Sequence, residues 1–133
     1  MDKKYKISFD FDSTLDREDV QEFAKQLVND GHEIWITTSR FDTESSLKKG
    51  WWWIEKNNQQ LYDVADECGI PRDNISFTAM IDKIKFLEGN DFLFHLDDDE
   101  VELELIQESD DNCVGVWVEL KDWKKTCINL IKK

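Results

Sequence analysis

A short apolar run near the start of the chain, closed by two aspartates, constrains the fold more than any other feature. Ile7, Phe9 and Phe11 give this run a composition typical of a strand, and it is too short for a buried helix. Asp10 and Asp12 lie at its carboxyl end, where open α/β sheets bind their ligands. The stretch therefore predicts an α/β sheet with two acidic side chains at its ligand-binding edge.

Two carboxylates placed so close together are costly. At about 4 Å and an effective dielectric constant near 20, like charges repel each other by roughly 4 kcal/mol. A proton, a cation or a basic side chain would relieve that repulsion. The alternative is a turn in which both aspartates are simply solvated.

Length and composition fit one folded domain spanning residues 1–133, with 40% hydrophobic residues to build a core. The net charge of −13 should repel long polyanions, so it disfavours nucleic acid as a partner. Cys68, Cys113 and Cys127 are widely spaced, which favours buried free thiols in a reducing compartment. The sequence shows neither a signal peptide nor an apolar run of membrane-spanning length, so we expect a cytoplasmic protein without a membrane partner.

Short apolar runs alternate with segments of helical periodicity along the rest of the chain. We expect further strands over residues 32–38, 74–78, 91–96 and 112–118. We expect helices over 15–29 (with Asp16 as N-cap), 51–68, about 81–87 and 101–106, and from Trp123 onward. This alternation predicts a doubly wound, Rossmann-like three-layer α/β sandwich around a mostly parallel five-stranded sheet.

Polar side chains end three of these expected strands, and they should meet at one edge of the sheet. They are Asp10 and Asp12, then Thr38, then Asp97 and Asp98, with Lys83 and Lys85 shortly before the fourth strand. Several carboxylates with a lysine and a hydroxyl suit a hard cation and a phosphoryl group. Mg²⁺ prefers oxygen ligands and relieves carboxylate repulsion, so the sequence predicts a Mg²⁺ site.

The same residues, in this order, resemble the motifs of the haloacid-dehalogenase-like superfamily of phosphohydrolases. The resemblance rests on Asp10-x-Asp12-x-Thr14, a strand-end threonine, a lysine and an aspartate pair, and it spans roughly residues 5 to 118. It implies an enzyme that hydrolyses phosphate monoesters through an aspartyl phosphate. Asp10 would be the nucleophile and Asp12 the general acid and base. Ser13 departs from the glycine that is usual in the family.

The resemblance also implies how Mg²⁺ would be held. Its ligands would be Asp10, the backbone carbonyl of Asp12 and one residue of the later acidic pair. Asp98 is the preferred member of that pair and Asp97 the alternative.

Phosphate would be held, by the same resemblance, by the end of the second strand and by a lysine. Thr38 and Ser39 match the family's hydroxyl-x-Arg ending, and Arg40 could contact an anionic part of the substrate. Lys83 fits the family's Lys-x-x-Phe-Leu pattern better than Lys85 does, but both stay open.

A single helix fills the chain between Thr14 and His32, so the resemblance implies a minimal member without a large cap domain. Such a protein would act on nucleotides or other small phosphate esters. Polynucleotide 3′-phosphatase, protein phosphatase and an inactive binding module are the alternatives. A receiver domain would need an acidic residue ending the third strand, and residues 75–78 have none.

Two aromatic features stay open. His95 lies within an expected strand, so it is either a packed side chain or a catalyst. Trp51, Trp52 and Trp53 cannot all face one core, so they form either a partly exposed helix surface or a platform for substrate.

Overall fold

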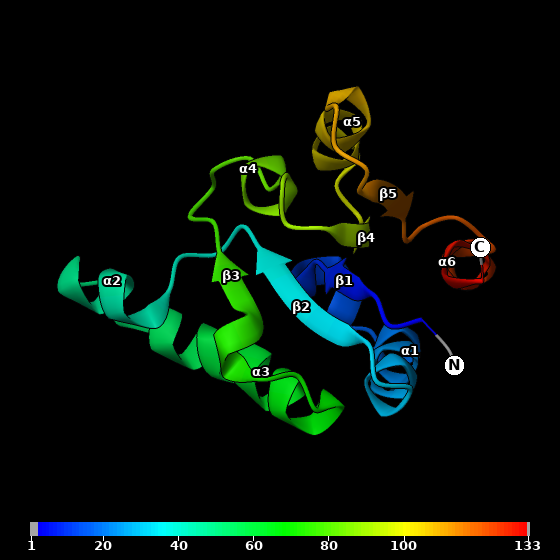
Figure 1. Ribbon diagram of the computed structural model, residues 1–133. Coiled ribbons are helices and arrows are strands. Elements are labelled where there is room, and N and C mark those ends of the chain that lie inside the picture. Colours follow the sequence, from blue (N-terminus) through cyan, green and yellow to red (C-terminus); the bar gives the residue numbers. More distant parts are fainter. Residues whose placement is uncertain (1–2, 133) are drawn as a thin grey trace.

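Five parallel strands run through the centre of the computed structural model, which describes residues 3–132 (Figure 1). Their order in the sheet is β3-β2-β1-β4-β5, and every neighbouring pair is parallel. The strands are β1 (Lys6–Phe9), β2 (Glu33–Thr38), β3 (Ile75–Phe77), β4 (Phe92–Asp97) and β5 (Val114–Trp117). The five-stranded, Rossmann-like sheet predicted from the sequence is confirmed.

The direction in which strands are added reverses between β1 and β4. From β1 the chain adds β2 and β3 on one side, then crosses over to add β4 and β5 on the other. The two inner strands carry buried apolar residues on one face of the sheet, where Ile7 pairs with Phe94 and Phe9 with Leu96, and all four are fully buried. Such a reversal opens a crevice at the carboxyl ends of the strands, which is where ligands bind in these sheets.

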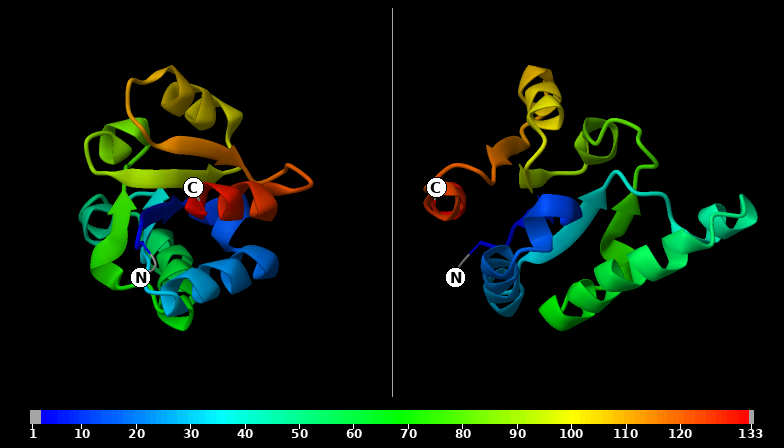
Figure 2. Two further views of the ribbon diagram at one scale, coloured as in Figure 1. Left: turned by 45° about the vertical axis from the view of Figure 1, so that its right-hand side comes forward. Right: turned by 180° about the vertical axis from the view of Figure 1, so that it is seen from behind.

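Helices cover both faces of the sheet, which gives three layers (Figure 2). One apolar cluster includes residues of α1 (Glu18–Asn29), α3 (Trp53–Cys68) and α6 (Trp123–Ile131), and a second includes residues of α4 (Ile84–Leu87) and α5 (Glu100–Glu108). The short α2 (Thr43–Lys48) extends beyond the edge of the sheet (Figure 1). The segment 101–106 lies within α5 and is helical, as expected.

The first helix begins later than its sequence pattern indicates. Residues Phe11–Leu15 form a separate helical turn, η1, whose closing bonds run from the Leu15 N–H to the Asp10 carbonyl and from the Asp16 N–H to the Phe11 carbonyl. Because this turn already uses Asp16, α1 starts at Glu18, and the prediction of Asp16 as N-cap is wrong. Ser13 in this turn has φ 60°, the left-handed conformation that favours glycine.

The three cysteines are buried and free, as expected from their spacing. Burial raises the pKa of the Cys113 and Cys127 thiols to about 12, so neither is a ready nucleophile. Within residues 3–132, no helix combines the length and the apolar character that crossing a membrane requires.

Candidate metal and phosphate site

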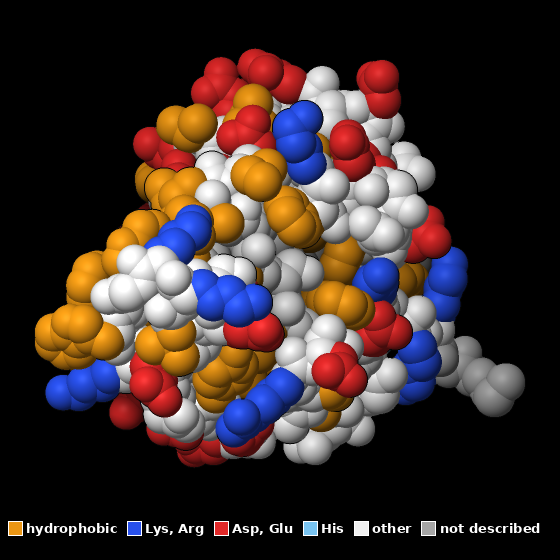
Figure 3. Space-filling view, turned by 90° about the vertical axis from the view of Figure 1, so that its left-hand side faces the viewer, with side chains coloured by type: hydrophobic (Ala, Val, Ile, Leu, Met, Phe, Trp, Pro, Cys, Tyr) orange, Lys and Arg blue, Asp and Glu red, His pale blue; other side chains and the backbone are white. Residues whose placement is uncertain are grey.

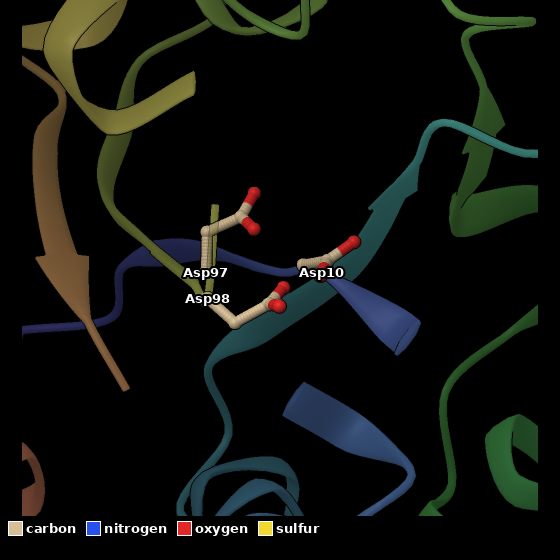
Figure 4. A group of neighbouring side chains, drawn as sticks. All are labelled: Asp10, Asp97 and Asp98. Atoms are coloured by element: carbon tan, nitrogen blue, oxygen red, sulfur yellow. The ribbon is translucent and has the colours of Figure 1, made fainter. Parts of the chain in front are cut away.

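Three carboxylates meet at the carboxyl ends of β1 and β4. Asp10 follows β1, Asp97 ends β4, and the Asp10 N–H donates to the Leu96 carbonyl at 2.9 Å, which holds the two strand ends together. One oxygen from each of Asp10, Asp97 and Asp98 lies within 4.8 Å of the other two. Figure 4 shows the Asp98 side chain turned toward Asp10. The fold thus brings together acids from opposite ends of the chain.

A buried lysine joins this cluster from the loop before α4. Lys83 is 2% exposed, and its Nζ lies 2.8 Å from Asp10 Oδ1 and 2.7 Å from Asp97 Oδ2. Glu102 of α5 accepts a hydrogen bond from the backbone N–H of Lys83 at 2.8 Å, which fixes this loop. Lys85 is exposed, so of the two candidate lysines only Lys83 reaches the carboxylates.

Asp97 and Asp98 have different surroundings, although they are adjacent in sequence. Asp97 Oδ2 accepts from Lys83 and from His95 Nε2 at 2.7 Å, and its Oδ1 accepts from the Asp99 N–H at 3.0 Å. Both of its oxygens therefore have protein partners, whereas Asp98 is only half-buried and faces Asp10. The geometry favours Asp98 over Asp97 as a direct metal ligand, with Asp97 holding Lys83 in place.

A chain of hydrogen bonds crosses the sheet beneath Asp97. His95 is fully buried, which lowers its pKa and leaves the imidazole neutral. Since the carboxylate of Asp97 can only accept, His95 Nε2 carries the proton and Nδ1 accepts from Ser8 Oγ at 2.8 Å. The Thr37 hydroxyl must then donate to Ser8 Oγ, also at 2.8 Å. His95 is thus a packed strand residue that orients Asp97.

The cluster carries more buried negative charge than Lys83 can balance. Burial and the nearby charge of Asp97 raise the pKa of Asp10 to about 9. Burial would also raise the pKa of Asp97, but hydrogen bonds from His95 and Lys83, together with the positive charge of Lys83, hold that pKa below its usual range. Asp98, whose pKa burial raises, makes a side-chain hydrogen bond with Asp10. Asp10 therefore keeps a proton near neutral pH, in the position that a cation would take.

Asp12 lies outside this cluster. Its carboxylate accepts two hydrogen bonds from Arg40, from Nε at 2.9 Å and from Nη2 at 2.6 Å. Arg40 also donates to the Asn57 carbonyl at 2.7 Å, so the guanidinium bridges the turn after β1 and the helix α3. The sequence places Asp12 beside Asp10, but it does not reveal that Arg40 binds the Asp12 side chain.

The expected phosphate-binding residues end β2, next to β1. Thr38 is fully buried, and its hydroxyl oxygen accepts from the Arg40 N–H at 3.2 Å, which leaves the hydroxyl proton free to be donated. The neighbouring Thr37 instead hydrogen-bonds Ser8, in the chain of hydrogen bonds beneath Asp97. Ser39 follows at the partly exposed end, where its carbonyl accepts from the Met80 N–H at 2.9 Å.

Thr78, directly after β3, lies next to the candidate phosphate-binding Thr38 and was not among the residues expected from the sequence. Thr78 is 1% exposed. Among the buried side-chain nitrogen and oxygen atoms of the described residues, its hydroxyl oxygen alone has no hydrogen-bond partner. Its backbone N–H donates to the Thr38 carbonyl at 2.8 Å. Its position after a short apolar run, like that of Thr38, was the signal that could have identified it.

Comparisons with known protein families, with curated proteins and with solved structures found no match to this chain.

The donor set of the cluster suits Mg²⁺. All three side chains offer carboxylate oxygens, and one ammonium group leaves their charge undercompensated. Mg²⁺ keeps several of its waters and needs only one or two carboxylates from a protein. Asp10 and Asp98, which face each other, would supply these ligands, while the neutral His95 is committed to Asp97 and Ser8.

Proposed function

We propose that this protein is a Mg²⁺-dependent phosphomonoesterase of the haloacid-dehalogenase-like type, with Asp10 as the nucleophile. The observation that carries the proposal is the meeting of Asp10, Asp98 and Lys83 at the carboxyl edge of a parallel sheet. Bound Mg²⁺ would supply positive charge to the phosphoryl oxygens and to the carboxylates. The resemblance of the motifs in sequence supports the same assignment.

The two oxygens of Asp10 are held differently, which suits a nucleophile. Oδ1 accepts the 2.8 Å bond from Lys83, while the bond that Oδ2 accepts from the Thr14 hydroxyl is long, at 3.4 Å. A weakly bound carboxylate oxygen is free to attack phosphorus. Lys83, Thr38 and Ser39 would then bind the non-bridging phosphoryl oxygens, as donors placed where negative charge develops.

In the first step Asp10 attacks the phosphorus atom of the substrate. A bond forms between an Asp10 oxygen and phosphorus, the ester P–O bond breaks, and the leaving oxygen takes a proton from Asp12, which has to part from Arg40 and take up that proton from solvent before this step. In the second step a water oxygen attacks the aspartyl phosphate while Asp12 accepts a proton from that water. The P–O bond to Asp10 breaks, which releases inorganic phosphate and restores both carboxyl groups to their starting states.

The test is release of inorganic phosphate from a panel of nucleotides, sugar phosphates, phosphopeptides and 3′-phosphorylated oligonucleotides, with Mg²⁺ and with a chelator. We expect wild-type turnover that requires the metal and that Asp10→Asn abolishes while the circular dichroism spectrum is unchanged. Asp73→Asn, an exposed aspartate just before β3, is the matched control and should retain full activity. Turnover that survives Asp10→Asn would refute the proposal, and no turnover at all would favour an inactive binding module.

A further inference from the structure

A hollow of about 290 Å³ opens beside the candidate phosphate site, and we call it the Arg40 hollow. Asp12 and Arg40 line it together with the apolar side chains of Phe41, Ile54 and Met80. It therefore begins at the residue that would protonate the leaving oxygen and continues away from the carboxylate cluster. In this position it can hold the leaving group of a phosphate ester.

A strained turn builds one wall of the hollow. Ala79 and Met80 have φ of 54° and 69°, in the left-handed region that side chains rarely adopt. Their N–H groups donate to the carbonyls of Arg40 at 3.1 Å and Ser39 at 2.9 Å, which hold the turn in this conformation. The result is a Met80 side chain that is 72% exposed at the edge of the hollow. Strain of this kind is frequent where a protein positions a group for binding.

The surface around the hollow is unusually apolar and aromatic. Large hydrophobic side chains that are at least 44% exposed gather on the segments 47–53 and 80–81, namely Leu47, Trp52, Trp53, Met80 and Ile81. Figure 3 shows hydrophobic side chains grouped on this side of the molecule, with lysines and arginines among them. Trp53 precedes Asn57 by one helical turn, so it lies on the same face of α3 as a residue that lines the hollow.

This surface is also less acidic than the rest of the protein. Residues 40–58 contain four Lys or Arg and three Asp or Glu, in a chain whose net charge is −13. Lys49 Nζ lies 4.8 Å from the centre of the Phe41 ring and 4.9 Å from that of Trp51. A surface that combines exposed aromatic rings with cations attracts molecules that are both planar and anionic.

We propose that the Arg40 hollow binds the base of a nucleoside monophosphate, so that the substrate is a phosphate ester whose leaving group carries a nucleobase. This inference rests on the proposed function. The volume of the hollow is near the lower limit of ligand pockets, about 300 Å³, which suits one ring system rather than a macromolecule. The Asn57 side chain lines the hollow and makes no hydrogen bond within residues 3–132, so its amide can pair with the polar edge of a base.

The experiment compares three phosphate esters at one Mg²⁺ concentration: adenosine 5′-monophosphate, ribose 5-phosphate, which lacks the base, and phosphotyrosine, which has a ring without a base edge. We expect kcat/KM to be at least about tenfold higher for the nucleotide than for ribose 5-phosphate, the size of one base–aromatic stacking contact. Met80→Ala and Trp53→Ala should each reduce this ratio several-fold. Leu120→Ala, which truncates an exposed side chain in a different hollow, should leave it unchanged.

The outcomes separate this inference from the proposed function. Equal kcat/KM for the nucleotide and ribose 5-phosphate would overturn the nucleobase site while leaving the phosphatase intact. A preference for phosphotyrosine over the nucleotide would overturn it in favour of an aryl phosphate. If no ester is hydrolysed, the phosphatase proposal fails. Calorimetric binding of the nucleotide and of ribose 5-phosphate to Asp10→Asn then decides the base site, because equal affinities would overturn it.

Discussion

Lys83 Nζ and Asp97 Oδ2 form an ion pair at 2.7 Å, with 2% and 0% of their side chains exposed to solvent. Burying two charges costs several kcal/mol per ion, and that cost is offset only when each charge has good partners. Lys83 meets this condition by binding Asp10 as well, and Asp97 meets it by binding His95. The pair therefore holds the carboxylate cluster together. Removing one of its partners should lower the free energy of unfolding far more than removing one partner of an exposed ion pair.

We expect Lys83→Met to lower the free energy of unfolding by about 3–5 kcal/mol, because two buried carboxylates lose their shared cation. Urea unfolding monitored by tryptophan fluorescence measures this change. Lys85→Met, two residues away on the exposed side of the same segment, should change it by less than about 0.5 kcal/mol. Equal effects of the two substitutions would mean that Lys83 is not the lysine of the site.

Mg²⁺ should stabilise the protein, and more strongly as the pH rises. The pKa of Asp10 is raised to about 9, so in the metal-free protein a proton occupies this carboxyl group at neutral pH. Metal binding must displace that proton, so the apparent affinity should increase by up to about tenfold per pH unit between pH 6 and 8. The increase in melting temperature with Mg²⁺ over a chelator, measured at pH 6, 7 and 8, checks this expectation. A smaller increase at pH 8 than at pH 6 would contradict it.

The same pKa sets the pH dependence of the metal-free protein. The folded pKa of Asp10 lies above its unfolded value, so folding takes up a proton. The contribution of the protonated Asp10 side chain to stability is complete below about pH 4 and is lost as the pH rises toward 9. Asp10→Asn should remove both this dependence and the response to Mg²⁺, and it provides the control for the metal experiment.

The orientation of the hydrogen bonds beneath Asp97 predicts unequal effects for two similar substitutions. Ser8→Ala leaves both His95 Nδ1 and the Thr37 hydroxyl without a partner, so it should cost about 2–4 kcal/mol of unfolding free energy. Thr37→Val only removes a donor to Ser8, which still donates to His95, and should cost about 1 kcal/mol or less. Chemical denaturation of both variants measures the difference. A larger loss of stability in Thr37→Val than in Ser8→Ala would show that the protons in this chain of hydrogen bonds are placed differently.

The fold was predictable because it depends on features that the sequence displays directly. Short, largely apolar runs such as residues 92–96 favour buried strands, and strands that alternate with helices indicate a parallel sheet. Within such a sheet, residues at strand ends lie at one edge whatever the details of packing. This is why Asp10, Asp97 and Asp98 were expected together, and why the structure brings them within 4.8 Å.

The partners of individual side chains were not predictable, because they depend on register and on rotamers. Ser8 binds His95 because these two residues are opposite each other in β1 and β4. A shift of one residue would turn their side chains to different faces. The pairing of Asp12 with Arg40 likewise depends on how the turn after β1 meets the end of β2, and no spacing in the sequence specifies that contact.

Asp10 and Asp12 should be separable by experiment, because the structure places their side chains in different surroundings. Asp12 lies outside the carboxylate cluster and binds Arg40, so we expect its side chain to have no part in holding Mg²⁺. If Asp12 is the acid and base, Asp12→Asn should lower kcat by about 10²–10⁴-fold, the usual contribution of proton transfer. The increase in melting temperature with Mg²⁺ should remain, whereas Asp10→Asn should lose turnover and metal response together. An Asp12→Asn protein that no longer responds to Mg²⁺ would place Asp12 in the metal site, and one with full turnover would exclude it from proton transfer.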